Sequence, residues 1–278
     1  MRPNPPASLD LERLLTVTFA AARQAGAAIM GVYAGDFAVS RKADASPVTL
    51  ADQRAETLIL AALAAAAPGI PVIAEEQADA DGLPAETADL FWLVDPLDGT
   101  KEFISRNGEF TVNIGLIRRG EPVLGMVHVP ALGVTYAGAG PGSARRWRGA
   151  GAAEKITARL PPPEGLVVVH SRSHENNEKL GAYLVGKTVA ETRVCGSSVK
   201  FCLIAAGEAD LYPRFGPTME WDTAAGHAVL LAAGGSVTTL DGAPFTYGKQ
   251  GFRNPGFIAR GLSPLAHSAS PLPHAGEG

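Results

Sequence analysis

The first half of the chain opens with two stretches in which apolar residues recur every three or four positions, as in helices with one buried face. The first covers residues 9–33. The second is expected to begin at a cap on Thr49 and to end near Ala67, before Pro68-Gly69. The polar segment 34–48 between them predicts a mobile loop. The residues expected to face inward are Leu11, Leu14, Leu15, Ala22, Ala25 and Ile29 in the first helix and Leu50, Leu58, Ile59 and Leu63 in the second.

Short apolar runs bounded by turn residues predict strands in the rest of this half. They cover residues 70–74, 90–94, 111–117, 122–129 and 133–137. The last three are expected to be antiparallel, and Arg118-Arg119-Gly120 joins the first pair of them. Residues 77–89 predict a polar excursion, and the Gly-, Pro- and Arg-rich residues 138–164 predict the seam between two halves.

The second half alternates strand-like and helix-like segments, which is typical of an α/β arrangement. Strands are expected at residues 166–169, 188–194, 210–212, 236–240 and 257–259, and helices at residues 175–185, 196–206 and 221–233. We therefore divide the chain into an N-terminal half, residues 9–145, and a C-terminal half, residues 155–262. The tail, residues 263–278, has no periodicity and is expected to be disordered.

Composition narrows the setting in which the protein acts. The 278 residues carry a net charge of −4, so no general basic surface for nucleic acid is implied. Cys195 and Cys202 form neither a disulfide framework nor a zinc pattern, and reduced thiols in a cytoplasm are expected. The N-terminus lacks the apolar core of a signal peptide, and the Ala-rich run at residues 61–67 is too short to span a bilayer. We expect a soluble, cytoplasmic protein.

The stretch Asp95-Pro96-Leu97-Asp98-Gly99-Thr100 follows an apolar strand directly. Acids buried at the end of a strand are costly unless something pairs with them. Pro96 removes an amide and is expected to end the strand pairing, which frees the Leu97 carbonyl to join the two carboxylates around a hard divalent cation. The amides of Gly99 and Thr100 can open a helix toward an anion. The pattern indicates metal-assisted phosphate chemistry; the simpler alternative is an Asp-rich turn with Asp98 as a helix cap.

Four further acids follow the same logic, and each also has a simpler explanation. Asp52 lies in the first turn of the second helix, where it can complement the helix dipole. Glu75 and Glu76 follow a strand, where they can form a solvated acidic turn. Asp222 lies at the start of a helix, where it can act as the N-cap.

Three of these motifs, taken together and in order, resemble the inositol-monophosphatase superfamily of Mg²⁺-dependent, Li⁺-sensitive phosphatases. They are Glu75-Glu76, Asp95-Pro96-Leu97-Asp98-Gly99-Thr100 and Trp221-Asp222-Thr223-Ala224-Ala225-Gly226. Three others resemble its CysQ branch, the 3′(2′),5′-bisphosphate nucleotidases of sulfur assimilation. These are Gly99-Thr100-Lys101-Glu102-Phe103, Gly196-Ser197-Ser198-Val199-Lys200-Phe201-Cys202 and Leu211-Tyr212-Pro213-Arg214-Phe215-Gly216-Pro217. The resemblance covers roughly residues 9–260.

The resemblance implies a fold, a reaction and a metal centre. The fold is a layered αβαβα sandwich, α+β in its first half and α/β in its second. The reaction is hydrolysis of the 3′-phosphate of adenosine 3′,5′-bisphosphate (PAP) to AMP and phosphate, with two or three Mg²⁺ ions as cofactors. Glu75, Asp95 and the Leu97 carbonyl resemble the ligands of the first ion, and Asp95, Asp98 and Asp222 those of the second. Asp52 and Thr100 resemble the pair that aligns and deprotonates the attacking water.

The resemblance also implies where the nucleotide binds. The Gly99 and Thr100 amides are expected to hold the phosphoryl oxygens. Lys200 and Arg214 are expected to hold the non-reacting phosphate, although each can also be a solvated cation. Near the nucleotide, the resemblance places Ser171, His174, Gly196 and Ser197; for His174 a structural role is the alternative. PAPS as a second substrate, a monomer or a homodimer, and peripheral contact with the inner membrane all stay open.

Two other functions compete with the nucleotidase. An inositol or sugar phosphatase has the same metal motifs, but Lys101-Glu102 differs from the Asn-Phe-like sequence usual in the inositol branch. A non-catalytic nucleotide-binding regulator would bind PAP without releasing phosphate, and the complete set of metal motifs argues against it.

Overall fold

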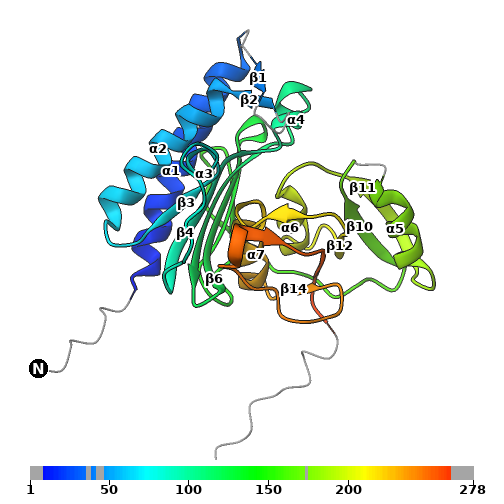
Figure 1. The fold of residues 1–278 in the computed structure, drawn as a ribbon. Coiled ribbons are helices and arrows are strands. Elements are labelled where there is room, and N and C mark those ends of the chain that lie inside the picture. The colour runs from blue at the N-terminus through cyan, green and yellow to red at the C-terminus, as the bar shows by residue number, and fades with distance from the viewer. Residues whose placement is uncertain (1–8, 36–38, 42–46, 173–174, 264–278) are drawn as a thin grey trace, which may run out of the picture.

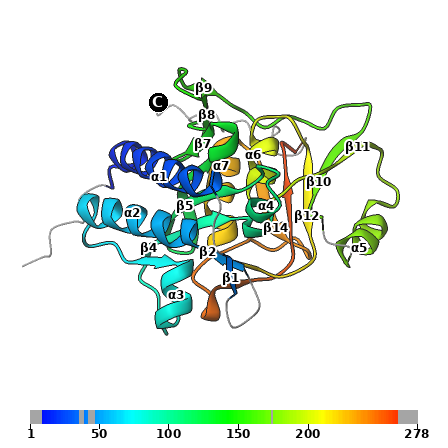
Figure 2. The same cartoon turned by 90° about the horizontal axis from the view of Figure 1, so that it is seen from above.

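Helices and sheets alternate in five layers. The computed structural model describes residues 9–35, 39–41, 47–172 and 175–263. In Figures 1 and 2 two helices cover the outer face of one sheet, two more lie between this sheet and a second one, and another flanks the second sheet. In that order the helices are α1 (Leu11–Tyr33), α2 (Leu50–Ala66), α6 (Val199–Ala205), α7 (Trp221–Ala232) and α5 (Glu175–Leu184). The layered αβαβα fold predicted from the sequence is confirmed.

The first sheet has seven strands in the order β3-β4-β5-β6-β7-β8-β9. The first pair is parallel and all the others are antiparallel. Two strands, β8 and β9, lie in the segment that was predicted as a seam. They extend the sheet because β8 pairs with β7 and β9 pairs with β8, partners that composition could not reveal. The strands are β3 (Val72–Ala74), β4 (Leu90–Asp98), β5 (Thr111–Arg118), β6 (Glu121–Val129), β7 (Val134–Gly138), β8 (Arg145–Arg148) and β9 (Glu154–Lys155).

The second sheet has five strands in the order β11-β10-β12-β16-β14, and its pairing is mixed. Two pairs are parallel, and the pairs that include β16 are antiparallel. These strands are β10 (Leu166–His170), β11 (Val189–Val194), β12 (Leu211–Arg214), β14 (Ser236–Thr239) and β16 (Phe257–Arg260). A short ladder of β13 (Thr218–Met219) and β15 (Arg253–Asn254) lies beside the start of α7.

Two segments predicted to lack regular structure contain short elements. β1 (Val39–Arg41) and β2 (Pro47–Thr49) pair antiparallel within the predicted mobile loop, so part of that prediction is wrong. The helix α3 (Glu75–Asp81) occupies the start of the predicted polar excursion. Both elements are too short to show a hydrophobic period, which is why the sequence pattern missed them. The remaining short elements are α4 (Thr100–Ile104), η1 (Pro130–Leu132) and η2 (Gln250–Phe252).

Helix α7 lies directly on the inner face of the first sheet because glycines replace side chains beneath it. A Cβ atom on Gly115 of β5 would lie 2.8 Å from the Ala224 Cβ, and one on Gly138 of β7 would lie 2.5 Å from the Ala232 Cβ. Small residues on both surfaces therefore permit the close approach. The consequence is that the first turn of α7, which carries Asp222, is held against the first sheet.

The buried face of α2 differs from the predicted one. In α2, Leu50 and Leu58 are exposed, with 45% and 37% of their surfaces accessible, whereas Ile59 and Leu63 are buried as expected. The same inward face carries two acids, Asp52 and Glu56, which are 3% and 6% exposed. A face that buries carboxylates in place of leucines indicates that α2 is turned to serve a polar site.

Helix α1 is, by length and composition, apolar enough to cross a membrane. Its buried residues, among them Leu14, Ala22 and Ile29, pack against α2 and the first sheet. The apolar character of α1 is accounted for by this position in the core.

Candidate active site

The turn after β4 forms the centre of the candidate site. Pairing with β5 runs to Asp95 opposite Asn113, shifts register, and resumes at Asp98 opposite Thr111. Pro96 therefore interrupts the ladder, as its missing amide requires, but it does not end the strand as predicted. Gly99 then adopts a left-handed conformation with φ of 92°, and α4 begins at Thr100.

Two local hydrogen bonds hold Asp95 and the Leu97 carbonyl in this turn. The Asp95 carboxylate accepts a hydrogen bond from the Leu97 amide at 3.0 Å, and the Thr100 hydroxyl donates to the Leu97 carbonyl at 3.4 Å. The alternative interpretation of Asp98 as a helix cap is wrong, because Gly99 occupies the N-cap position and no side chain caps α4. The turn instead presents the carboxylates and the carbonyl on one short segment.

Acids from three other elements reach the same region. Glu75 begins α3 directly after β3, and the parallel pairing of Ala74 with Val94 brings it next to the end of β4. Asp52 is in the first turn of α2 and Asp222 in the first turn of α7. We call Glu75, Asp95, Asp98 and Asp222 the acid end of the site.

The pKa shifts of these carboxyl groups indicate that they repel one another. The pKa of Asp95 is raised well above its usual value, first by burial and then by repulsion from Glu75, Asp98, Asp222 and Asp52. The pKa of Asp222 is also raised well above its usual value, by burial and by Asp98 and Glu75. Such repulsion between buried carboxylates is relieved when a cation binds among them.

The donor set suits Mg²⁺, which prefers oxygen ligands and keeps several waters. Among the described residues, no group of three or more acids, histidines or cysteines stands close enough together to hold a metal ion. Of the acid end, Asp98 and Asp222 line a cavity, which can admit water and substrate.

Three residues that the sequence reasoning missed hold Asp98 in place. Its Oδ2 atom accepts hydrogen bonds from the Ser198 amide at 2.7 Å, from Asn113 Nδ2 at 3.3 Å and from the Thr111 hydroxyl at 3.4 Å. Asn113 is fully buried and Ser198 is almost so. The available signal was a lone polar residue, Asn113, at an inward position of an otherwise apolar strand.

Asp222 is tied into the same network. The Ser198 hydroxyl donates to the Asp222 carbonyl at 2.6 Å, and the Met219 amide donates to Asp222 Oδ2 at 2.8 Å. The prediction that Asp222 caps α7 is wrong: the N-cap position belongs to Glu220, and no side chain caps the helix there. Glu220 is fully buried and anchors this end by accepting from the Gly248 and Lys249 amides at 2.7 and 2.9 Å.

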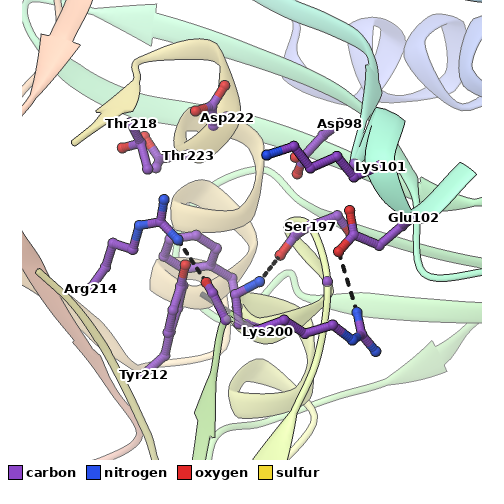
Figure 3. A pocket seen from close by; sticks show the side chains of 15 residues that line it. Asp98, Lys101, Glu102, Ser197, Lys200, Tyr212, Arg214, Thr218, Asp222 and Thr223 are labelled. Atoms are coloured by element: carbon purple, nitrogen blue, oxygen red, sulfur yellow. Dashed lines mark hydrogen bonds and ion pairs between the residues drawn. The ribbon is translucent and has the colours of Figure 1, made fainter. Parts of the chain in front are cut away.

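A pocket of about 410 Å³ adjoins the acid end. Figure 3 shows Asp98 and Asp222 on one side of it and Tyr212, Lys200 and Arg214 on the other. Six of the predicted substrate contacts line the pocket, namely Gly99, Ser171, Gly196, Ser197, Lys200 and Arg214. Thr100 is not part of the lining, and His174 lies outside the described residues. Residues that the sequence reasoning missed are Lys101, Glu102, Arg172, Phe201, Tyr212, Thr218 and Thr223.

We call Ser171, Lys200 and Arg214 the cation end of the pocket. Arg214 Nη1 donates to the Ser171 hydroxyl at 2.7 Å, and its buried Nε has no partner among the described residues. Lys200 is 3% exposed, and its ammonium donates to the carbonyls of Cys195 and Ser197 at 3.1 and 2.5 Å. An ammonium has three N–H groups. Two of those of Lys200 donate to the turn before α6, and the third can donate to a ligand.

The turn before α6 presents a further unused group. Ser197 has a φ of 46°, an uncommon conformation for a residue with a side chain. Its hydroxyl is buried and has no hydrogen-bond partner among the described residues. Strained backbone and an unpaired buried hydroxyl on a pocket wall are typical of a ligand contact.

Comparisons with known proteins show which proteins the chain resembles. A profile of the inositol monophosphatase family matches residues 10–269. The chain is 50% identical to the 3′(2′),5′-bisphosphate nucleotidase CysQ of Salmonella typhimurium over 240 residues, which are 85% of this chain and 95% of the relative. The corresponding CysQ of Escherichia coli K12 is 49% identical over 241 residues, with the same shares.

Solved structures extend the likeness to the fold. The crystal structure of CysQ from Bacteroides thetaiotaomicron, described as a bacterial member of the inositol monophosphatase family, has a TM-score of 0.76 and 36% identity. The match covers 92% of this chain and 99% of that chain. An IMPase from Thermotoga maritima has a TM-score of 0.73 at 24% identity, covering 90% and 92% of the two chains, and shows the fold alone.

Proposed function

This chain belongs to the inositol monophosphatase family, and from that premise we propose that it is a Mg²⁺-dependent phosphatase acting on PAP. It removes the 3′-phosphate and yields AMP and inorganic phosphate. The names of the relatives in the CysQ branch support a bisphosphate nucleotide as the substrate. We propose that it acts in the cytoplasm, and PAPS is the second nucleotide to be tested.

One observation carries the proposal: a single pocket has carboxylates at one end and cations at the other. A metal-assisted phosphatase needs the first, because carboxylates would hold the Mg²⁺ ions that activate the reacting phosphoryl group. A substrate with two phosphates needs the second, because the phosphate that is not cleaved requires a positive partner away from the acids. A substrate with one phosphate would leave Arg214 with its buried, unpaired Nε.

We propose that Glu75, Asp95 and the Leu97 carbonyl hold one Mg²⁺, and that Asp95, Asp98 and Asp222 hold a second. Whether a third ion takes part is left to metal titration. When bound, the ions polarise the phosphoryl oxygens and increase the acidity of water.

The remaining roles belong to the protein's own groups. Thr100 Oγ1 aligns the attacking water, and the Asp52 carboxylate, which is 3% exposed, is the base to which its proton passes. The Gly99 and Thr100 amides at the start of α4 hold the phosphoryl oxygens. At the other end Arg214, with Ser171 as its neighbour, binds the 5′-phosphate, and the Ser197 hydroxyl and Gly196 contact the nucleotide.

The test is phosphate release from PAP with Mg²⁺ and with EDTA, compared with release from inositol 1-phosphate under the same conditions. We expect Mg²⁺-dependent release from PAP and little from inositol 1-phosphate. Faster turnover of inositol 1-phosphate would replace the nucleotidase by an inositol phosphatase. Tight binding of PAP without any release would favour a regulatory protein.

A further inference from the structure

Four cations line the pocket, and three of them are already engaged by the protein. Arg172 donates to Glu102 at 3.3 Å and to Glu109 at 2.6 Å. Lys200 is bound to two carbonyls, and Arg214 to the Ser171 hydroxyl. The fourth cation is Lys101. Its ammonium makes no hydrogen bond or ion pair with any residue that the structure describes.

The charge of Lys101 is also not cancelled by the acid next to it in sequence. Glu102 is paired with Arg172, and the same Arg172 bridges to Glu109, which in turn accepts from the Gly196 amide at 2.8 Å. This network engages the carboxylate of Glu102, on the wall of the pocket, and that of Glu109 behind it in the chain of contacts. Lys101 is therefore available to an anion that enters.

The position of Lys101 in the fold indicates which anion it binds. Lys101 lies in the first turn of α4, directly after Gly99 and Thr100. In Figure 3 the Lys101 side chain extends into the pocket on the side of Asp98 and Asp222, opposite Arg214 and Tyr212. A cation on that side stands beside the reacting phosphate, whereas Arg214 stands beside the other one.

We propose that Lys101 binds the phosphoryl group that is cleaved and stabilises the negative charge on its oxygens during transfer. The inference rests on the proposed function. It makes Lys101 a catalytic residue, and it predicts that Lys101 and Arg214 affect different substrates. Lys101 contributes to every substrate that presents a phosphoryl group at the acid end. Arg214 contributes only to substrates that carry a second phosphate. Charge-assisted contacts of this kind correspond to about a ten- to hundredfold effect.

The experiment compares Lys101→Met, which keeps length and removes charge, with Lys101→Arg, which restores charge. Lys179, an exposed residue of α5 outside the pocket, supplies the matched control Lys179→Met. Each variant is assayed on PAP and on adenosine 3′-monophosphate at saturating Mg²⁺. We expect Lys101→Met to lower kcat/KM by about ten- to hundredfold on both substrates, Lys101→Arg to recover most of it, and Lys179→Met to match the wild type.

A second readout does not depend on turnover. Binding of inorganic phosphate to the Mg²⁺-loaded protein, measured by calorimetry, is expected to weaken in Lys101→Met and not in the control Lys179→Met. A loss confined to PAP would overturn the proposal by placing Lys101 on the second phosphate. Unchanged kcat/KM and phosphate binding would overturn it by making Lys101 a counter-ion of the acids only. If the wild type fails to release phosphate from PAP at all, the proposed function fails first, and the two failures are distinct.

Discussion

At the acid end of the pocket, buried carboxylates face one another and raise each other's pKa, whereas at the cation end Lys200 and Arg214 already donate to oxygen atoms of the protein. At the acid end Lys200 lowers the pKa of Asp98 and Arg214 lowers that of Asp222, but burial and repulsion between the acids outweigh both. The cation end is organised before any ligand arrives. The contrast teaches that the proposed nucleotide contacts are already held in place whereas the proposed metal ligands repel one another, so metal binding is expected to affect both activity and local stability.

The largest effect expected from breaking this contrast is that of Asp95→Asn. Asp95 is shared by both proposed metal positions and is 2% exposed, so its loss should abolish turnover of PAP. The metal-free variant should melt at the same temperature as the metal-free wild type or higher, because one source of repulsion is removed. Phosphate release and thermal unfolding in EDTA measure the two outcomes. Asp89→Asn, at an exposed position, is the control, and near-normal activity of folded Asp95→Asn would refute the metal assignment.

The next largest effect is expected for Arg214→Ala, which tests the role of the cation end. Removing a charge-assisted bond of about 1.5–3 kcal/mol should lower kcat/KM for PAP by roughly ten- to hundredfold. Adenosine 3′-monophosphate, which lacks the second phosphate, should be turned over almost as before. The ratio of kcat/KM for the two substrates is the measurement, and an equal loss on both would show that Arg214 serves the reacting phosphate or the fold.

Lys200→Ala should behave differently from Arg214→Ala, although the sequence suggested the same role for both residues. The Lys200 ammonium holds the Cys195 and Ser197 carbonyls and also lies 5.1 Å from the centre of the Tyr212 ring. Its removal leaves buried carbonyls unpaired, so we expect lower stability and a loss on both substrates. Thermal unfolding alongside the two assays tests this; a loss on PAP alone, at unchanged stability, would return Lys200 to the role of a pure phosphate contact.

The pH dependence of metal-free stability probes the acid end together with Glu56, a buried acid of α2. Burial raises the pKa of Glu56, which accepts from the Glu76 and Gln77 amides of α3, from 4.5 to about 7. A carboxyl group with a higher pKa in the folded chain stabilises folding at low pH, and this contribution is lost as the pH rises through the folded-state pKa. The metal-free protein should therefore lose stability as the pH rises from 4.5 toward 7.

Unfolding midpoints in EDTA across this range measure the effect. Mg²⁺ added above the window should restore stability, because the ion binds the folded state. The variant Glu56→Gln should flatten the profile in part, leaving the share of Asp95 and Asp222. A metal-free midpoint that rises with pH over the same range would contradict the repulsion inferred here.

The smallest effect we expect is that of Ser198→Ala, which loosens the link between Asp98 and Asp222. The variant keeps the hydrogen bond from the backbone amide of residue 198 to Asp98. It removes the hydroxyl that donates to the Asp222 carbonyl and accepts from Asn113. A buried hydrogen bond contributes about 1 kcal/mol, roughly a fivefold change in Mg²⁺ half-saturation. Ser105→Ala, at an exposed position, should leave the Mg²⁺ titration unchanged. Identical titrations for both variants would show that Ser198 has no part in positioning the ligands.

The sequence by itself determined what depends on near neighbours. Period and turn residues predicted the long helices and most strands, and the turn from Asp95 to Thr100 could be interpreted because its oxygen donors and its glycine lie within six consecutive residues. Its motifs also led to the family, since the acids of α3 and α7 occur in a recognisable order.

Only the tertiary structure decided what depends on distant partners. It turned Leu50 and Leu58 outward and Asp52 inward. The reason is that Asp52 of α2 lies near Asp95 of β4. It bent the Lys200 ammonium back onto two carbonyls and paired β8 with a strand already in the sheet. It bound Asp98 to Ser198, a residue 100 positions away in the chain. Such contacts form between surfaces that meet only after folding, and no local pattern encodes which surfaces these are.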